Sequence, residues 1–420
     1  MKISPITKDI QDQLKPHLPK QKQPPMFSKK SAQIIEKLIH FIYKADQSWT
    51  KASAKVQETS IQQNAPNQFT KGPSYSYIPE EVRSPFEKEA TWQMQYTFVL
   101  FNRQYTLTCV LPNYAAPNGG SKSKKFFDQV LYKTWLWLHI LHHFAPAICS
   151  KQVDLYFYFT DHLKTLDNTL SKTPLDMQHV NTAFTTSCSP KTDIHLFRTE
   201  EWFKVFIHET FHNMGLDFSD RQFDQDNRAA DKFIHRLFPV GVEVRLFETY
   251  CETWAELIHT VFFVYFMHPP SAAIHLGQMV KKIEKHMQYE QLWSAYQCIK
   301  VLRHYDLTYK QLTDLDCPRA KRMRETHYKE NTYVLSYYVI KSVFLSNIDD
   351  FLAWMLENNG RSNPVYFKKT GENVRQYCAL VAALYQDPQY LQLLEHASKI
   401  QLQEHPSLQK SLRMTVHELA

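Results

Sequence analysis

The stretch that decides the fold lies at residues 199–215 and reads TEEWFKVFIHETFHNMG. Its apolar side chains recur at helical spacing, which predicts one helix across most of the stretch. Thr199 suits an N-cap, and Gly215 stands where a helix ends in the left-handed conformation that glycine favours. The large residues that predict burial of this helix are Trp202, Phe203, Val205, Phe206, Ile207 and Phe211.

Within this helix, His208 and His212 stand four residues apart, so both imidazoles project from one face and can bind a single metal ion. Together with Glu209 they form the pattern HExxH, in which the glutamate takes a proton from the attacking water while zinc polarises a carbonyl group. We therefore predict one Zn²⁺ ion on His208 and His212, with Glu209 as the catalytic base. The competing interpretation is an amphipathic helix on which both histidines are exposed or are hydrogen-bonded in a core.

A catalytic zinc site needs a third protein ligand. One known extension of the motif puts it six residues after the second histidine, but that position is Phe218, whose side chain cannot bind a metal. Asp217 and Asp220 lie nearby and stay open as alternatives. Their other interpretation is solvation of a loop.

A long helix expected over 242–266 carries further carboxylates. Glu252 and Glu256 lie one turn apart within the run ETWAE, and Glu252 stands 40 residues beyond His212. Glu248 lies one turn earlier on the same face and is the fallback ligand. The small side chain of Ala255 suits close packing against a neighbouring helix.

HExxH with a downstream ExxAE helix resembles the gluzincin group of zincin metallopeptidases over about residues 95–265. The resemblance implies Glu252 as the third zinc ligand and Glu256 as a carboxylate that orients a histidine. It also implies a peptide or protein substrate that pairs with an edge strand, for which residues 192–197 are the candidate. An ordinary core strand is the alternative for that segment.

The stretch from NTAFTTSC to the HETFH helix is also similar to predicted metallopeptidase-like proteins of large nucleocytoplasmic DNA viruses. This resemblance implies a protein made in the host cytoplasm that associates with the virion or capsid. An oxyanion donor in the helical half is expected as well, with Tyr333, Tyr337 and Tyr338 as candidates beside His304 and His327.

The remaining pattern predicts an α+β fold with a small mixed sheet and the active-site helix, followed by a mostly helical subdomain. The order of these elements resembles that of a zincin, which implies a zincin-like fold. Stretches with a period of two on either side of residues 102–104 predict a β-hairpin. Residues 124–144 are expected to form a buried helix, and residues 153–159 are expected to form a strand. Later helices are expected at 276–300, 331–358, 371–384 and 388–402. The expected segments are a flexible basic tail (1–30), a helix and a linker (31–90, the linker over about 50–75), the zincin N-terminal subdomain (91–220) and the helical subdomain (221–420).

Composition limits the partners. The chain has 420 residues, 43% of them hydrophobic, and 49 Lys and Arg against 42 Asp and Glu give a mild net charge of +7. No nucleic-acid module, signal peptide or apolar stretch long enough for a transmembrane segment is evident. Seven scattered cysteines without a C-x-x-C pair favour a reducing, intracellular location, with Cys188 as a free buried thiol.

Two other functions compete with the zinc metallopeptidase. One is a catalytically inactive zincin-like structural or virion-associated protein that keeps the metal for stability. The other is a zinc hydrolase of a different amide bond, because the same chemistry serves many substrates. The intact Glu209 favours an enzyme, since a purely structural site has no need of that carboxylate.

Overall fold

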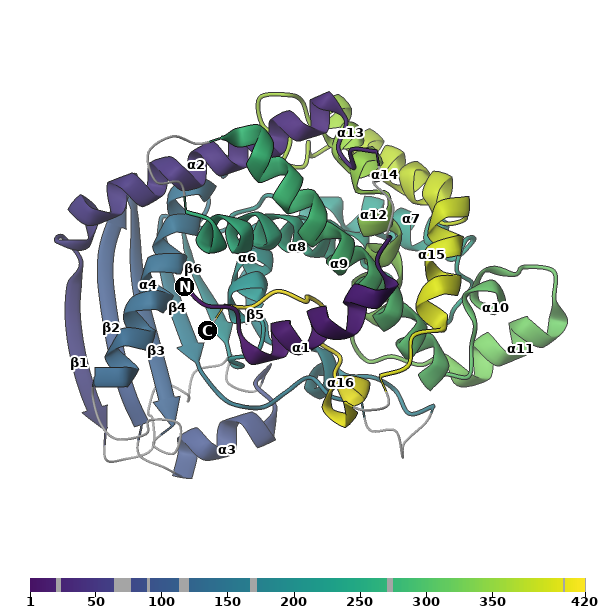
Figure 1. Ribbon diagram of the computed structural model, residues 1–420, viewed down its shortest axis with the longest axis horizontal. Coiled ribbons are helices and arrows are strands. Elements are labelled where there is room, and N and C mark those ends of the chain that lie inside the picture. The colour runs from purple at the N-terminus through teal and green to yellow at the C-terminus, as the bar shows by residue number, and fades with distance from the viewer. Residues whose placement is uncertain are drawn as a thin grey trace. The chain divides into compact units, whose positions relative to one another are not determined.

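Two units make up the chain in the computed structural model, which describes residues 1–19, 24–63, 77–88, 91–112, 121–166, 172–269, 275–402 and 405–419 (Figure 1). The sheet unit comprises His40–Leu163 and Asn181–Leu216. The helical unit comprises Met1–Ile39, Lys164–Val180 and Asp217–Ala420. The expected α+β class is confirmed, and each unit is described by itself.

The sheet unit contains a six-stranded mixed sheet in the order β1-β2-β3-β4-β6-β5. Strands β3, β4 and β6 are parallel to one another, and the other neighbours are antiparallel. The strands are β1 Gln57–Gln63, β2 Thr91–Leu100, β3 Arg103–Pro112, β4 Gln152–Tyr158, β5 Ala183–Thr185 and β6 Lys191–Leu196.

The predicted hairpin is confirmed as β2 and β3, which pair from Leu100 and Arg103 outward. Its turn consists of Phe101 and Asn102, both with positive φ, whereas residues 102–104 were expected. Two consecutive positive φ values are typical of the tight turns whose twist matches that of the flanking strands. Strand β1 lies in the expected linker, and residues 64–75 of that linker lie outside the described part of the chain.

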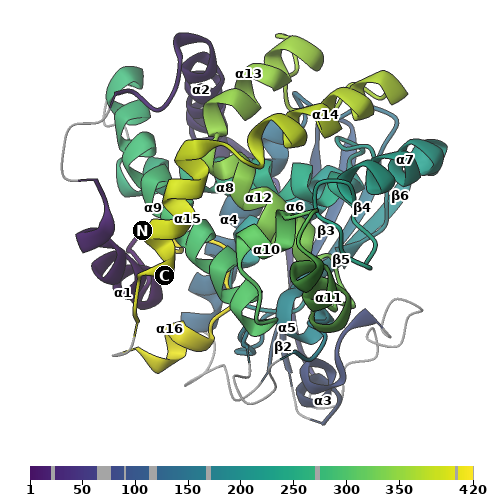
Figure 2. The same cartoon turned by 90° about the vertical axis from the view of Figure 1, so that its right-hand side faces the viewer.

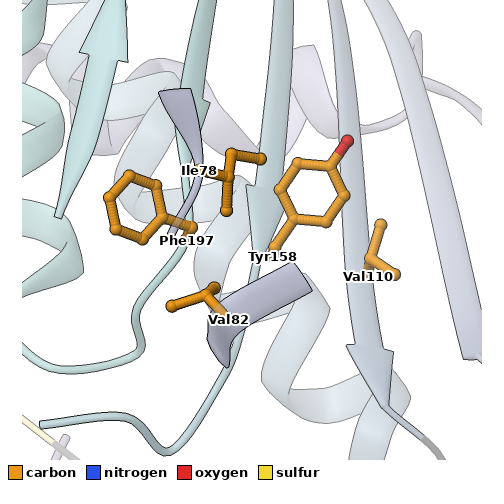
Figure 3. Close-up of a cluster of buried hydrophobic side chains, with 5 residues drawn as sticks. All are labelled: Ile78, Val82, Val110, Tyr158 and Phe197. Carbon is orange, nitrogen blue, oxygen red and sulfur yellow. The ribbon is translucent and has the colours of Figure 1, made fainter. Parts of the chain in front are cut away.

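Helices cover both faces of the sheet. Helix α4 (Ser121–Leu141) runs along one face of the sheet (Figure 1). Helix α6 (Trp202–Asn213) lies on the same face and contacts strands β5 and β6. The start of α3 (Glu80–Lys88) covers part of the other face. There Ile78 and Val82 pack against Val110, Tyr158 and Phe197, as Figure 3 shows.

The prediction that residues 192–197 form an edge strand is wrong. Strand β6 pairs with β4 on one side and with β5 on the other, so it lies inside the sheet. The edge on this side of the sheet is β5, an antiparallel strand of only three residues.

The helical unit is built around α8 (Leu246–Met267), in which every residue from Leu246 to Phe266 is buried. Helix α9 (Leu276–His304) packs against α8 and also lies beside α15 (Figure 2). The single helix expected at 331–358 is instead divided into a π-helical turn and two α-helices. The other elements are α7 Asp224–Ile234, α10 Tyr309–Thr313, α11 Pro318–His327, η6 Leu335–Ile340, α12 Lys341–Ser346, α13 Ile348–Asn358, α14 Gly371–Leu384, α15 Pro388–Ser398 and α16 Pro406–Lys410, with short turns η1 Lys15–His17 and η5 Arg221–Phe223 and α5 Met177–Val180.

The segment that was expected to be a flexible basic tail, 1–30, contains a helix. Residues Pro5–Leu14 form helix α1, which buries Ile10 and Leu14 and contacts α9. The chain before it pairs with the C-terminal segment through an Ile3–Leu419 bridge. Helix α2 (Lys29–Ser53) follows, and its residues belong to both units. Tertiary burial of a few apolar side chains thus outweighs the polar composition of this segment.

Candidate metal-binding helix and its carboxylate partners

Helix α6 carries the HExxH motif on a fully buried scaffold, since all 12 of its residues are buried. The predicted N-cap at Thr199 is wrong: the helix begins at Trp202, and Glu201 precedes it in the left-handed region with φ 59°. The amide of Trp202 donates to the Thr199 carbonyl, so Thr199 belongs to the turn before the helix.

The predicted end at Gly215 is confirmed. Gly215 has φ +65°, its amide donates to the His212 carbonyl at 3.1 Å, and the amide of Leu216 donates to the Phe211 carbonyl at 2.8 Å. These two bonds form a Schellman motif, which satisfies carbonyls that a helix end otherwise leaves without partners. The motif fixes the last turn of α6, in which His212 lies.

The two histidines of the motif are brought together. Their Nε2 atoms lie 3.2 Å apart, and the residues are 5% and 8% exposed. Two imidazole nitrogens on one tetrahedral zinc ion, each about 2.0–2.1 Å from the metal, lie about 3.3 Å from each other. The donor set and its spacing therefore fit a shared zinc ion, although two neutral imidazoles joined by a hydrogen bond give a similar distance.

The opposite face of α6 is held by helix α4. The indole Nε1 of Trp137 donates to Thr210 Oγ1 at 2.8 Å, and that hydroxyl donates to the Ile207 carbonyl at 2.6 Å. Thr210 is two residues from both histidines and therefore projects from another side of the helix. Glu209 is 8% exposed and directly follows His208. The motif thus lies on a helix whose rotation is fixed by a buried hydrogen bond.

Asn213, which the sequence reasoning missed, fastens the end of α6 to the sheet. Its amide nitrogen donates to Thr185 Oγ1 and to the Asp193 carbonyl, at 3.1 and 3.3 Å. Its amide oxygen accepts from the hydroxyls of Ser150 and Thr192, at 3.0 and 3.2 Å. A fully buried asparagine needs such partners. Its position directly after the second histidine was the available signal.

A disulfide joins Cys149 and Cys188, so the expectation that Cys188 is a free thiol is wrong. The two cysteines are 39 residues apart in sequence, and no local spacing pattern marks them as a pair. They meet because β4 and β6, which follow them, are neighbouring parallel strands. The pairing therefore depends on strand order, which the sequence does not display.

The carboxylates predicted as ligands lie on α8, in the helical unit. Glu248 is 8% exposed, Glu252 is 2% exposed and Glu256 is fully buried. Glu256 Oε2 pairs with the Lys341 ammonium at 2.9 Å, and both side chains are almost completely buried. Lys341 also donates to the Met414 carbonyl at 3.3 Å. This pairing differs from the expected role of Glu256, which was to orient a histidine.

The three tyrosines predicted as candidate oxyanion donors contact different partners. Tyr337, in the π-helical turn η6, donates its hydroxyl to Glu248 Oε2 at 3.2 Å. Tyr338 donates to the Leu412 carbonyl, and Tyr333 lies under the Arg245 guanidinium, 4.4 Å from the ring centre. Burial raises the pKa of Tyr333, and the Arg245 charge opposes that rise. Of the three, Tyr337 is the one that the structure joins to a predicted ligand.

Other sequence candidates have structural partners within the helical unit. Asp217 accepts from Ser219 Oγ at 3.0 Å and from Cys251 Sγ at 3.6 Å, and Asp220 pairs with Lys369. His304 and His327 contact backbone carbonyls, those of Thr173 and Tyr305. These contacts account for both histidines without an oxyanion role.

A buried acidic residue lies near the Glu256–Lys341 pair. Burial raises the pKa of Glu290, and hydrogen bonds from its neighbours, including one with Glu256, oppose the rise. Glu290 accepts from Thr415 Oγ1 at 2.6 Å and from the Val416 amide at 2.8 Å. The C-terminal segment is thereby held inside the helical unit.

Comparison with models of known protein families, with curated proteins and with solved structures found no match. Within the described ranges, no helix combines the length and the apolar character that crossing a bilayer requires. The zincin resemblance therefore rests on the residues of this chain alone.

Proposed function

We propose that this chain is a zinc-dependent metallopeptidase of the zincin type. One observation carries the proposal: two histidine Nε2 atoms lie 3.2 Å apart on a buried helix, with a glutamate directly after the first histidine. Histidines four residues apart also occur as structural pairs, but those have no need of the intervening glutamate. HExxH chemistry requires all three side chains.

The roles of the residues follow from their chemistry. Zinc, when bound by His208 and His212, supplies the Lewis acidity that polarises the scissile carbonyl. Glu209 accepts the proton of the attacking water and passes it to the leaving amine. The Thr210–Trp137 hydrogen bond and the anchored Asn213 side chain hold the helix in one orientation while this proton moves.

We favour Glu248 over Glu252 as the third ligand on chemical grounds. The Tyr337 hydroxyl donates to one carboxylate oxygen of Glu248 and so fixes the direction in which this carboxylate points. Ligating carboxylates are commonly oriented in this way by a second hydrogen-bonding residue. The π-helical turn that carries Tyr337 supports the assignment, because such turns are frequent at functional sites.

We propose that an extended peptide substrate pairs with strand β5, and not with residues 192–197, which were the expected edge strand. Among the described residues, no strand pairs with the outer side of β5. Helix α6 contacts β5 directly, and Asn213 donates to Thr185 on that strand. Main-chain pairing at an open edge binds peptides with little dependence on sequence.

Zinc content tests the ligand set. We expect about one zinc per chain in the wild type, little in His212→Ala or Glu248→Ala, and wild-type content in Glu252→Ala and in the matched control Glu243→Ala, whose side chain is exposed. Elemental analysis gives the content, and circular dichroism checks the fold of each variant. Loss in Glu252→Ala alone returns the ligand role to Glu252.

Two outcomes contradict the proposed enzyme. Wild-type protein that binds no zinc even after reconstitution excludes a zinc hydrolase. Stoichiometric zinc without cleavage of any member of a peptide library contradicts a peptidase and leaves the structural protein and the hydrolase of a different amide bond as the alternatives.

Tyr337→Phe tests the orientation of Glu248. The hydroxyl is lost while the ring is kept, and we expect zinc affinity to fall about 10- to 100-fold. Competition with a chromophoric chelator measures that affinity. Tyr338→Phe is the matched control, because it also removes a buried hydroxyl from the same turn, one that donates to the Leu412 carbonyl.

Two other results are informative for Tyr337. A fall in kcat at unchanged zinc affinity assigns it to the oxyanion instead of the ligand. No change in either quantity shows that its hydroxyl has no part in the site.

A further inference from the structure

The Cys149–Cys188 disulfide lies next to Gly215, the residue at which the HExxH helix ends. A Cβ atom built on Gly215 would lie 3.0 Å from Cys149 Sγ and 3.1 Å from Cys188 Cβ, so the disulfide packs against the backbone of this residue. Gly215 comes three residues after His212, and its amide donates to the His212 carbonyl. The contact therefore reaches the turn that carries the second histidine.

Hydrogen bonds connect the residue after each cysteine with the same turn, directly for Ser150 and through Ser150 for Ser189. Ser150 follows Cys149, and its hydroxyl donates to the Asn213 carbonyl at 2.7 Å. The Ser150 amide donates to the carbonyl of Ser189, which follows Cys188, also at 2.7 Å. Ser150 itself has φ 54°, a conformation that a serine seldom adopts without support from its surroundings. The disulfide thus joins two loops that together hold the last turn of α6.

We propose that this disulfide is a redox control on metal binding by His208 and His212. The inference rests on the proposed zinc site and concerns its regulation. The oxidised form holds the histidine pair at the spacing that zinc requires, and the reduced form binds the metal more weakly.

The redox step is an ordinary thiol–disulfide exchange. Cys149 is 2% exposed, whereas Cys188 is partly exposed, so the thiolate of a dithiol reductant attacks Cys188 Sγ. The S–S bond breaks, and Cys149 leaves as a thiolate that takes up a proton. The second thiol of the reductant then resolves the mixed disulfide. Two cysteine thiols result, and the reductant becomes a disulfide.

Reduction disturbs the turn for a steric reason. Two sulfur atoms that no longer share a bond must separate to van der Waals distance, and both cysteines border the space beside Gly215 that a Cβ atom would occupy. We therefore expect the separation to shift the turn or to part the two loops. Metal affinity is sensitive to displacements of about 0.5 Å in the ligand positions.

The test compares zinc affinity in the two redox states of the full chain. The dissociation constant is measured by chelator competition for oxidised protein, for protein reduced and then freed of reductant, and for the same sample after reoxidation. We expect a weakening of tenfold or more on reduction and recovery on reoxidation. The Co²⁺-substituted protein gives a second readout, because its visible absorption reports the coordination geometry independently of activity.

Two variants separate the disulfide from other thiols. C149S/C188S should bind zinc weakly in both conditions, which also excludes zinc capture by the released thiols. C317S, which removes a free and partly exposed cysteine, should behave as the wild type does. If the double variant fails to fold, the reversible titration of the wild type still decides the question.

Equal zinc affinity in the two states of folded wild-type protein overturns this inference and leaves the proposed enzyme in place. Protein that binds no zinc in either state overturns both.

Discussion

Glu209→Gln is expected to lower kcat for peptide hydrolysis by about 10²- to 10⁴-fold while zinc content stays at the wild-type value. The amide has nearly the shape of the carboxylate but cannot accept the proton of the attacking water. Neither metal-binding histidine is altered, so the ion should remain. Steady-state kinetics and elemental zinc analysis on the same preparations measure the two quantities.

The matched control for this variant is Glu200→Gln. Glu200 is 7% exposed against 8% for Glu209, and it lies just before α6 rather than within the motif. We expect its kcat to stay close to the wild-type value. Unchanged hydrolysis in Glu209→Gln removes this residue from the mechanism, and loss of zinc in that variant shows that the carboxylate supports the metal site instead.

Lys341→Met is expected to destabilise the protein by about 3–5 kcal/mol. The substitution leaves the Glu256 carboxylate without the ammonium that lies 2.9 Å from it, in a place where both side chains are at most 1% exposed. A buried charge without its partner is costly, whereas removal of both charges is often nearly neutral. Urea unfolding followed by circular dichroism measures the change.

Two variants test this explanation of the Lys341 effect. The double variant Lys341→Met, Glu256→Gln should recover most of the lost stability, because it removes the charge that the single variant leaves buried. Lys399→Met should have a much smaller effect, since Lys399 and its partner Glu395 are both exposed. A single variant as stable as the wild type means that the ion pair contributes little to folding.

Large parts of the fold could be predicted because their signals are local. The hairpin at 91–112, the helix before β4, strand β4 and the end of α6 all follow from hydrophobic period and from glycine. The histidine pair follows as well, because residues four apart on a helix share a face in any tertiary setting. The Nε2 distance of 3.2 Å agrees with that expectation.

The errors share a different cause. A segment with few apolar residues, 1–30, forms α1 because Ile10 and Leu14 find a buried surface on distant parts of the chain. Residues 192–197 lie inside the sheet because the short strand β5 pairs with them. In both cases the outcome depends on which segments pack or pair with one another, and the local pattern of residues does not display that.

The features of the candidate site also fall into two groups, those set by local sequence and those set by contacts between distant residues. The amino-acid sequence by itself determined the HExxH helix, its buried character and its termination at Gly215, since helical period and glycine conformation act over a few residues. Only the tertiary structure decided that Cys149 meets Cys188, that Lys341 neutralises Glu256 and that Tyr337 binds Glu248. Such pairs, separated by 39 to 89 residues, form where strand order and helix packing bring side chains together, and no local periodicity encodes that arrangement.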